Sequence, residues 1–173
     1  MDVHSEQTEE VRDVLGRIYG AVAAIVRGDR LGVDLMLADV HASSDDIAEL
    51  LAAISYATLD RLAAALEPGG VLSPHETRAM ASALLTEARQ YSVSEAASIH
   101  AAAQRLDAVR RHDRDQVLLG IERARSMATD LELLWGATAL LTATVSEWAR
   151  RSGQSPRRAA ADLCLAVSVM PTS

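Results

Sequence analysis

The fold is decided by the stretch Arg27-Gly28-Asp29-Arg30-Leu31-Gly32-Val33-Asp34-Leu35. Five of its residues, Arg27, Asp29, Arg30, Val33 and Leu35, recur 84 residues later as Arg111, Asp113, Arg114, Val117 and Leu119. Matches at the same spacing continue without a gap, since Asp46, Leu50, Ala53, Thr58 and Gly69 recur as Asp130, Leu134, Ala137, Thr142 and Gly153. Repetition at a fixed period predicts two units that carry the same ordered set of elements. We therefore predict two halves, residues 1–91 and 92–173, packed as a single domain.

Apolar spacing predicts that these elements are helices. From Thr8 to Val26, apolar residues recur every three or four positions, which places them on one helix face. A short helix follows to Val40, and Ser43 or Ser44 then caps a long one that ends at Leu66. Its counterpart begins at Thr129 and ends at Gly153. The predicted inward residues of the two long helices are Ile47, Leu50, Leu51, Ile54, Thr58, Leu62 and Ala65 in the first, and Leu134, Leu141, Val145 and Trp148 in the second.

Helix starts and stops support the same division. Ser73-Pro74 with Glu76, and Ser92 with Glu95, have the spacing of capping boxes, and the Ser-Pro start alone returns at Ser155-Pro156. Glu67-Pro68-Gly69-Gly70 ends the first long helix. No run alternates like a strand. The sequence predicts an all-α, compact bundle of about eight helices built from two related four-helix halves.

Composition limits the class of protein. A chain of 173 residues can bury a sizeable core, and its few aromatics (3%) leave that core to aliphatic residues and alanine. The chain has no Lys, Asn or Phe, all of which use A/T-rich codons, and this favours a high-G+C bacterial source. The residues from Met1 to Glu10 do not resemble a signal peptide, and the one cysteine, Cys164, reads as a buried thiol. We therefore expect a cytoplasmic protein.

The net charge of −7 argues against binding to nucleic acid or to anionic membranes, and no apolar run approaches the ~20 residues of a membrane span. The segment Tyr91-Ser92-Val93-Ser94-Glu95-Ala96-Ala97 resembles the opening of MerR-type and excisionase-type helix-turn-helix proteins, which implies phosphate contacts from Arg105, Arg110, Arg111 and Arg114. That family continues with a glycine-containing turn, whereas residues 98–111 contain no Gly or Pro. A capping box explains the same residues, and we expect no nucleic-acid partner.

Residues that could carry chemistry are scattered. No two of the five histidines are spaced as metal ligands on a helix, and His41 and His112 with their neighbouring aspartates read as solvated helix ends. There is no phosphate loop and no nucleophile motif. The sequence thus predicts no catalytic, metal or cofactor site. It favours a non-enzymatic protein, and an enzyme built on residues far apart in the sequence is the third alternative.

One charged cluster lies at the Gly153 turn, where Arg150, Arg151, Arg157 and Arg158 follow one another closely. The first two suit a helix C-terminus, but the last two lie in the first turn of the next helix, against its dipole. We interpret the cluster as a docking surface for an acidic segment, such as Glu6 to Asp13 of a second copy. The predicted function is a non-enzymatic protein-interaction or regulatory module that binds a protein partner or forms a homodimer.

The leading alternative is a small-molecule sensor or carrier. Met127, Trp135 and Trp148 are then predicted to line an apolar pocket between the halves, which would accept a small apolar ligand.

Overall fold

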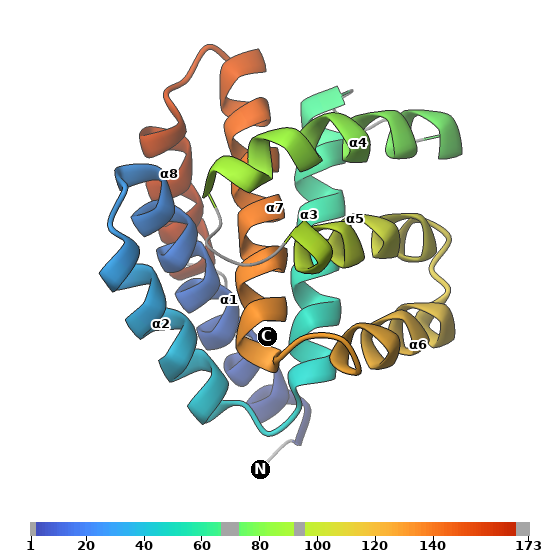
Figure 1. The fold of residues 1–173 in the computed structure, drawn as a ribbon. Helices are drawn as coiled ribbons and strands as arrows, with labels where there is room; N and C mark the ends of the chain where they lie inside the picture. The colour runs from blue at the N-terminus through green and yellow to red at the C-terminus, as the bar shows by residue number, and fades with distance from the viewer. Residues whose placement is uncertain (1–2, 67–72, 92–95, 169–173) are drawn as a thin grey trace.

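The computed structural model describes residues 3–66, 73–91 and 96–168, and within these ranges it contains eight helices and no strand (Figure 1). The all-helical bundle predicted from the sequence is therefore confirmed. In that part of the chain, none of the helices has the length and apolar character needed to cross a membrane. The helices are α1 (Val3–Arg27), α2 (Arg30–Ser43), α3 (Ile47–Leu66), α4 (Pro74–Tyr91), α5 (Ala96–Arg110), α6 (Arg114–Arg125), α7 (Asp130–Arg151) and α8 (Pro156–Ser168).

Two long helices, α3 and α7, lie side by side at the centre of the bundle (Figure 1). Helices α1, α2 and α8 cover one flank, and α4, α5 and α6 cover the other. The halves interleave, because α8 packs on α1 while α4 packs on α5. The last helix of each predicted half thus lies against the first helix of the other half. The duplication itself stays a prediction.

The starts of α2 and α6 have the same geometry. The Asp29 side chain accepts a hydrogen bond from the Gly32 N–H, and the Asp113 side chain accepts one from the Gln116 N–H. Each aspartate follows a residue with positive φ, Gly28 at 78° and His112 at 54°. These caps satisfy donors that a helix N-terminus otherwise leaves unpaired.

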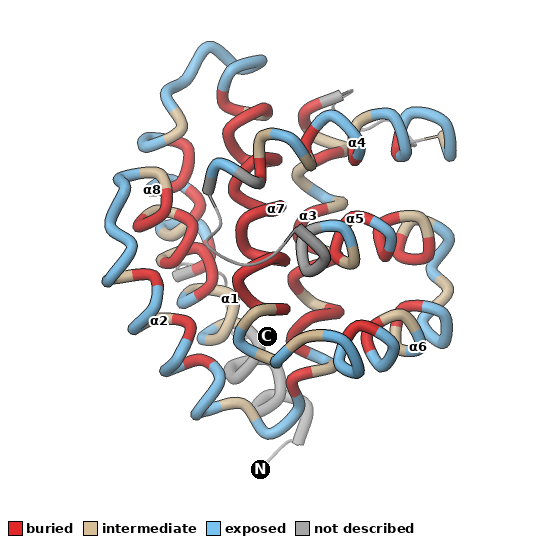
Figure 2. The backbone as a smooth tube through the Cα atoms, in the orientation of Figure 1, coloured by how far each residue is buried: buried red, intermediate tan, exposed pale blue. Residues whose placement is uncertain are grey.

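Burial is greatest along α7, which is enclosed from Leu133 to Glu147 (Figure 2). The predicted inward face of α3 is confirmed, since every residue of it is buried. On α7, Leu134, Leu141 and Val145 are buried, and Trp148 is half-buried. Two hydroxyls inside this core donate to carbonyls one turn earlier, from Thr142 to Thr138 (2.8 Å) and from Thr144 to Leu140 (2.9 Å), whereas the buried Thr138 hydroxyl has no partner among the described residues.

Some predicted helix signals differ from the structure or lie outside it. Asp46, rather than Ser43 or Ser44, caps α3 by accepting a hydrogen bond from the Glu49 N–H (3.1 Å), because Ser43 still belongs to α2 and Ser44 is the residue that ends that helix. The Ser73 and Thr129 capping boxes are formed as predicted. The Ser92–Glu95 box and the turn at residues 67–70 lie outside the described residues.

Candidate functional site

The four arginines predicted as an interaction surface divide into two pairs. At the end of α7, Arg151 Nε lies 2.6 Å from Glu147 Oε1, and Arg150 contacts the other oxygen of the same carboxylate. Glu147 is 7% exposed. Its buried carboxylate therefore already offsets much of the charge of this pair.

Arg150 and Arg151 also line a groove of about 440 Å³ between α4 and α7. Its floor is apolar, and three glutamates lie among its charged groups, so the groove does not present a basic surface. The lining residues are Glu76, Ala79, Met80, Ala83, Leu84, Glu87, Glu147, Arg150 and Arg151.

Arg157 and Arg158 lie in the first turn of α8, as predicted. The Ser155 hydroxyl caps this turn by accepting the Arg158 N–H (3.3 Å), and the Arg158 side chain lies 4.0 Å from Asp162. Within the described residues, no hydrogen bond or ion pair engages the Arg157 guanidinium. The uncompensated part of the cluster is thus at the start of α8.

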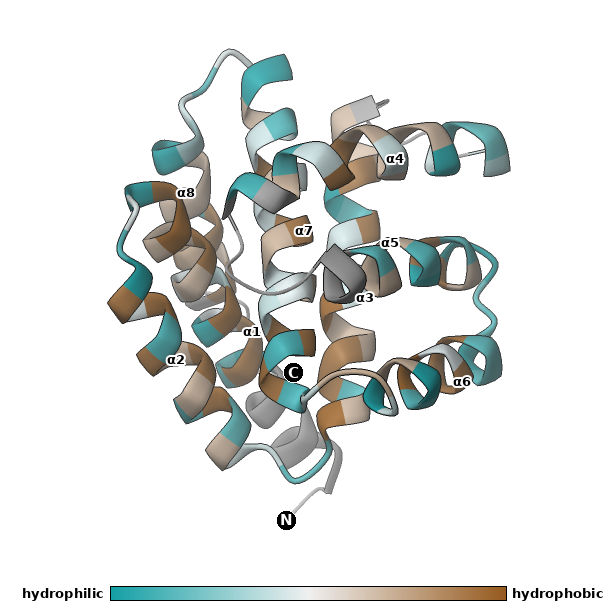
Figure 3. Cartoon of the chain, viewed as in Figure 1, coloured by the Kyte–Doolittle hydropathy of each residue, from teal (hydrophilic) through white to brown (hydrophobic). Residues whose placement is uncertain are grey.

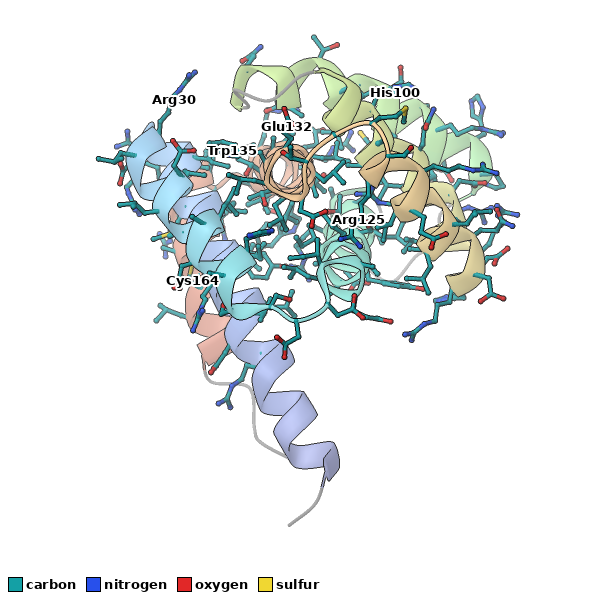
Figure 4. All side chains as sticks on the ribbon, turned by 60° about the horizontal axis from the view of Figure 1, so that its bottom comes forward. Arg30, His100, Arg125, Glu132, Trp135 and Cys164 are labelled. Atoms are coloured by element: carbon teal, nitrogen blue, oxygen red, sulfur yellow. The ribbon has the colours of Figure 1, made fainter. Side chains whose placement is uncertain are left out.

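The three residues of the predicted apolar pocket do not meet at one site. Trp135 is 4% exposed and donates its indole N–H to Asp34 on α2 (2.9 Å). Figure 4 shows it on the side of α7 that faces α2. Trp148 lies 13 residues further along α7, about 20 Å away along the helix axis, and its ring is covered by Arg61 at 5.4 Å. Met127 is 74% exposed between α6 and α7. The length of α7 separates the tryptophans.

A second groove of about 510 Å³ lies between α1, α2 and α8. Glycines at positions 16 and 20 hollow its α1 wall, and Arg17 spans its rim to Asp39 (3.1 Å). Cys164 lies in this groove, and burial raises the pKa of its thiol, which keeps it protonated and unreactive. The predicted buried thiol is in fact half-buried.

The outer side of α2 carries an apolar stripe that the sequence interpretation missed. It consists of Leu31, Leu35, Ala38 and Ala42, hereafter the α2 face, and Leu31 and Leu35 are 70% and 64% exposed. The opposite side of the helix buries Val33, Leu37 and Val40. Figure 3 colours much of α2 as hydrophobic, although Figure 2 marks most of it as exposed. The spacing of 31, 35, 38 and 42 was the available signal.

Of the four arginines that a helix-turn-helix resemblance assigns to phosphate contacts, three form ion pairs within the bundle and one is buried. Arg110 and Arg111 both contact Asp107, and Arg114 pairs with Glu49 on α3. Arg105 is buried, with 3% exposure. These four side chains do not form one basic face.

No group of three or more metal-binding side chains occurs among the described residues. His41 lies 3.8 Å from a carboxylate oxygen of Asp130, across the contact between α2 and α7. Comparison of the chain with protein-family models, with curated proteins and with solved structures finds no match.

Proposed function

We propose that this protein is a cytoplasmic, non-enzymatic helical module that acts through protein contacts, and that its α2 face binds the α2 face of a second copy. The observation that carries the proposal is a surface helix that is apolar on two opposite sides. One side, with Val33, Leu37 and Val40, packs in the core. The other places Leu31 and Leu35 in solvent, where a continuous apolar stripe is unfavourable unless another surface covers it.

The α2 face is complementary to itself. Its large residues, Leu31 and Leu35, occupy the first half of the stripe, and its small residues, Ala38 and Ala42, occupy the second. When two copies pair in antiparallel orientation, each leucine lies opposite an alanine of the other copy. Large side chains then fill the space left by small ones, which is how well-packed helix contacts form. A two-fold axis relates the two copies in this pairing, so the same surface patch of each copy contacts that of the other.

The pairing is expected to be weak. A four-residue stripe buries less than the ~800 Å² per partner of a standard stable interface. Association should therefore appear at micromolar or higher concentration, and the part contributed by the stripe should depend little on salt because the stripe is uncharged.

The test is sedimentation of the purified protein over a range of concentrations. The wild type should shift from monomer to dimer as concentration rises. The double variant Leu31→Asp/Ala38→Glu installs the residues found at the corresponding positions of α6, Asp115 and Glu122. It should stay monomeric with an unchanged helical circular dichroism spectrum. A wild type that is monomeric throughout, or a double variant that still dimerises, would refute the proposal.

A matched control and an orientation test sharpen this result. Leu165→Asp removes a leucine of α8 that is as exposed as Leu35 (64%), and it should leave dimerisation unchanged. Ala42→Leu makes the α2 face more apolar, yet it places a second leucine opposite Leu31 in the antiparallel pair. It should therefore weaken the dimer, whereas non-specific adhesion through the stripe would become stronger.

The start of α8 supplies a secondary contact in this proposal. Arg157 and Arg158 would bind an acidic segment, such as Glu6 to Asp13 of the second copy; the side chains of residues 3–11 lie outside the described part of the structure. Changing both arginines to Glu should weaken association at low salt only, because exposed ion pairs are screened. Equal association of this variant and the wild type at low salt would remove the contact from the proposal.

A second candidate function is that of a small-molecule sensor or carrier. The tryptophans do not support it, but Arg105 does, because this residue is buried and its terminal nitrogens have no hydrogen-bond partner among the described residues.

A further inference from the structure

Arg105 lies where α3, α5 and α6 meet. It is 3% exposed, and its side-chain stem runs along Gly120 of α6, where a Cβ atom would lie 3.5 Å from Arg105 Cγ. Its Nε donates a hydrogen bond to the Ser55 hydroxyl on α3 (3.3 Å). The two terminal nitrogens, Nη1 and Nη2, are buried and have no partner in the described part of the chain. Most of the donors of this guanidinium are therefore unused.

Among the described residues, no carboxylate compensates the charge of Arg105. Desolvation by burial lowers its pKa to about 10, and no acidic side chain contributes to the shift. The group is still protonated at neutral pH. A buried cation without a partner is strongly unfavourable, and natural proteins pair such groups or bind an ion to them.

The packing of the helices does not require this charge. The residues 84 positions away from Arg105, Gly120 and Ser55 are Ala21, Met36 and Ala139. They belong to α1, α2 and α7, which contact one another as α5, α6 and α3 do. There, Ala21 is buried at the position that matches Arg105, and the partly buried Met36 packs against the core with its sulfur 3.6 Å from where a Cβ atom of Gly20 would lie. An apolar side chain thus suffices to close a group of three helices of this kind.

We propose that α3, α5 and α6 enclose a binding site for the carboxylate or phosphate group of a small molecule, with the Arg105 guanidinium and the Ser55 hydroxyl as binding groups. Guanidinium binds both oxyanions through paired hydrogen bonds. Gly120 presents no side chain toward the site, and the neighbouring Leu106 and Ile121 are buried and apolar. Entry requires α6, at the edge of the bundle, to move away from α5 (Figure 1). This site is independent of the proposed α2 contact.

The test is thermal unfolding of the full chain in inorganic phosphate and, separately, in acetate, each at constant ionic strength set with chloride. At an anion concentration one hundred times its Kd, the Tm of the wild type should rise by about 5–10 °C. Arg105→Met should lose this response. The control Arg110→Met removes a partly buried arginine of the same helix that pairs with Asp107, and it should keep the response.

Two further readings decide the remaining outcomes. In nuclear magnetic resonance spectra of the wild type, the Arg105 Nε–H resonance should shift as the anion that binds is added, and the shift should reach a plateau. This measurement does not depend on how the variant folds. A response to phosphate alone or acetate alone assigns the ligand class. Equal Tm rises in the wild type and Arg105→Met, or an unmoved Arg105 resonance in both titrations, would show that the guanidinium binds neither anion and would overturn the proposal.

Discussion

The α1–α2 and α5–α6 pairs begin with the same backbone geometry and end with different surfaces. At both corners the capping aspartate donates its N–H to a carbonyl five residues earlier, from Asp29 to Ala24 and from Asp113 to Ala108, at 3.0 Å each. The residues that face inward also correspond, since Val33, Leu37 and Val40 match Val117, Ile121 and Ala124, and all six are buried.

The two pairs differ where packing does not constrain them. The α2 face has Leu31, Leu35, Ala38 and Ala42, whereas the corresponding side of α6 has Asp115, Leu119, Glu122 and Ser126. The interior of the second pair contains Arg105 in place of an alanine. The comparison teaches that the shared corner and the shared inner face specify the fold. We place the two proposed functions where the pairs differ, with self-association on the outer face of α2 and anion binding at Arg105 inside the α5–α6 pair.

The largest expected effect tests the matched inner faces. Leu37→Ala and Ile121→Ala each remove a fully buried side chain, so each should lower the free energy of unfolding by about 2–5 kcal/mol in urea titrations. Leu35→Ala, at 64% exposure, should change it by less than about 0.5 kcal/mol when measured on the monomer. A small cost at only one of the two inner sites would break the comparison between α2 and α6.

The capping aspartates test the matched corners. Asp29→Ala and Asp113→Ala each remove the acceptor for one N–H in the first turn of a helix. Each should cost about 0.5–2 kcal/mol of unfolding free energy, and the two costs should be similar. Asp115→Ala changes the charge in the same turn of α6 without removing this cap and should cost less. Unequal costs for Asp29 and Asp113 would show that the two corners are not equivalent.

The two Ser-Pro helix starts extend the comparison to α4 and α8. In α4, the Glu76 carboxylate accepts a hydrogen bond from the Ser73 N–H (3.0 Å), but α8 has Arg158 at the matching position. Arg158→Glu should complete a capping box and stabilise the fold by about 0.3–1 kcal/mol in urea titrations of the monomer. Arg157→Glu alters the same charge at a position that cannot close the box. Equal gains from both variants would indicate a general charge effect.

The smallest effect is a pH dependence that the boxed helices should show. Backbone and side-chain hydrogen bonds from Thr129 lower the pKa of Glu132 below 4.5, and hydrogen bonds from Ser73 do the same for Glu76. A lowered pKa means that this stabilisation is complete above about pH 4.5 and is lost as the pH falls through the lower value in the folded protein.

Glu132→Gln should therefore flatten the fall in Tm below about pH 4.5 relative to the wild type, measured by thermal unfolding from about pH 6 to about pH 3. The control Glu122→Gln, which changes an exposed glutamate on α6, should leave the profile unchanged. A wild-type profile that Glu132→Gln does not alter would show that the box adds no pH-dependent stability.

The sequence alone determined that the chain is helical and where several of its helices begin. Periodic apolar residues, Ser-Pro starts and positive-φ corners act within a few residues, so their effect is readable without tertiary contacts. The inward face of α3 followed from the same local periodicity, whereas the division of the chain into two related halves stays a prediction. The repeat also identified Asp29 and Asp113 as matching positions, which the caps then displayed.

Only the tertiary structure decided which helices lie together and which charges remain uncompensated. The sequence could not show that α8 packs on α1 or that Glu147 forms ion pairs with Arg150 and Arg151. Nor could it show that Trp135 and Trp148 contact different neighbours. It also gave no sign that Arg105 is buried against Gly120 and Ser55, because these residues come from three helices distant in the chain. Burial and charge pairing are sums over all neighbours in space, whereas helix signals are local, and this is why the candidate sites emerged only from the packed bundle.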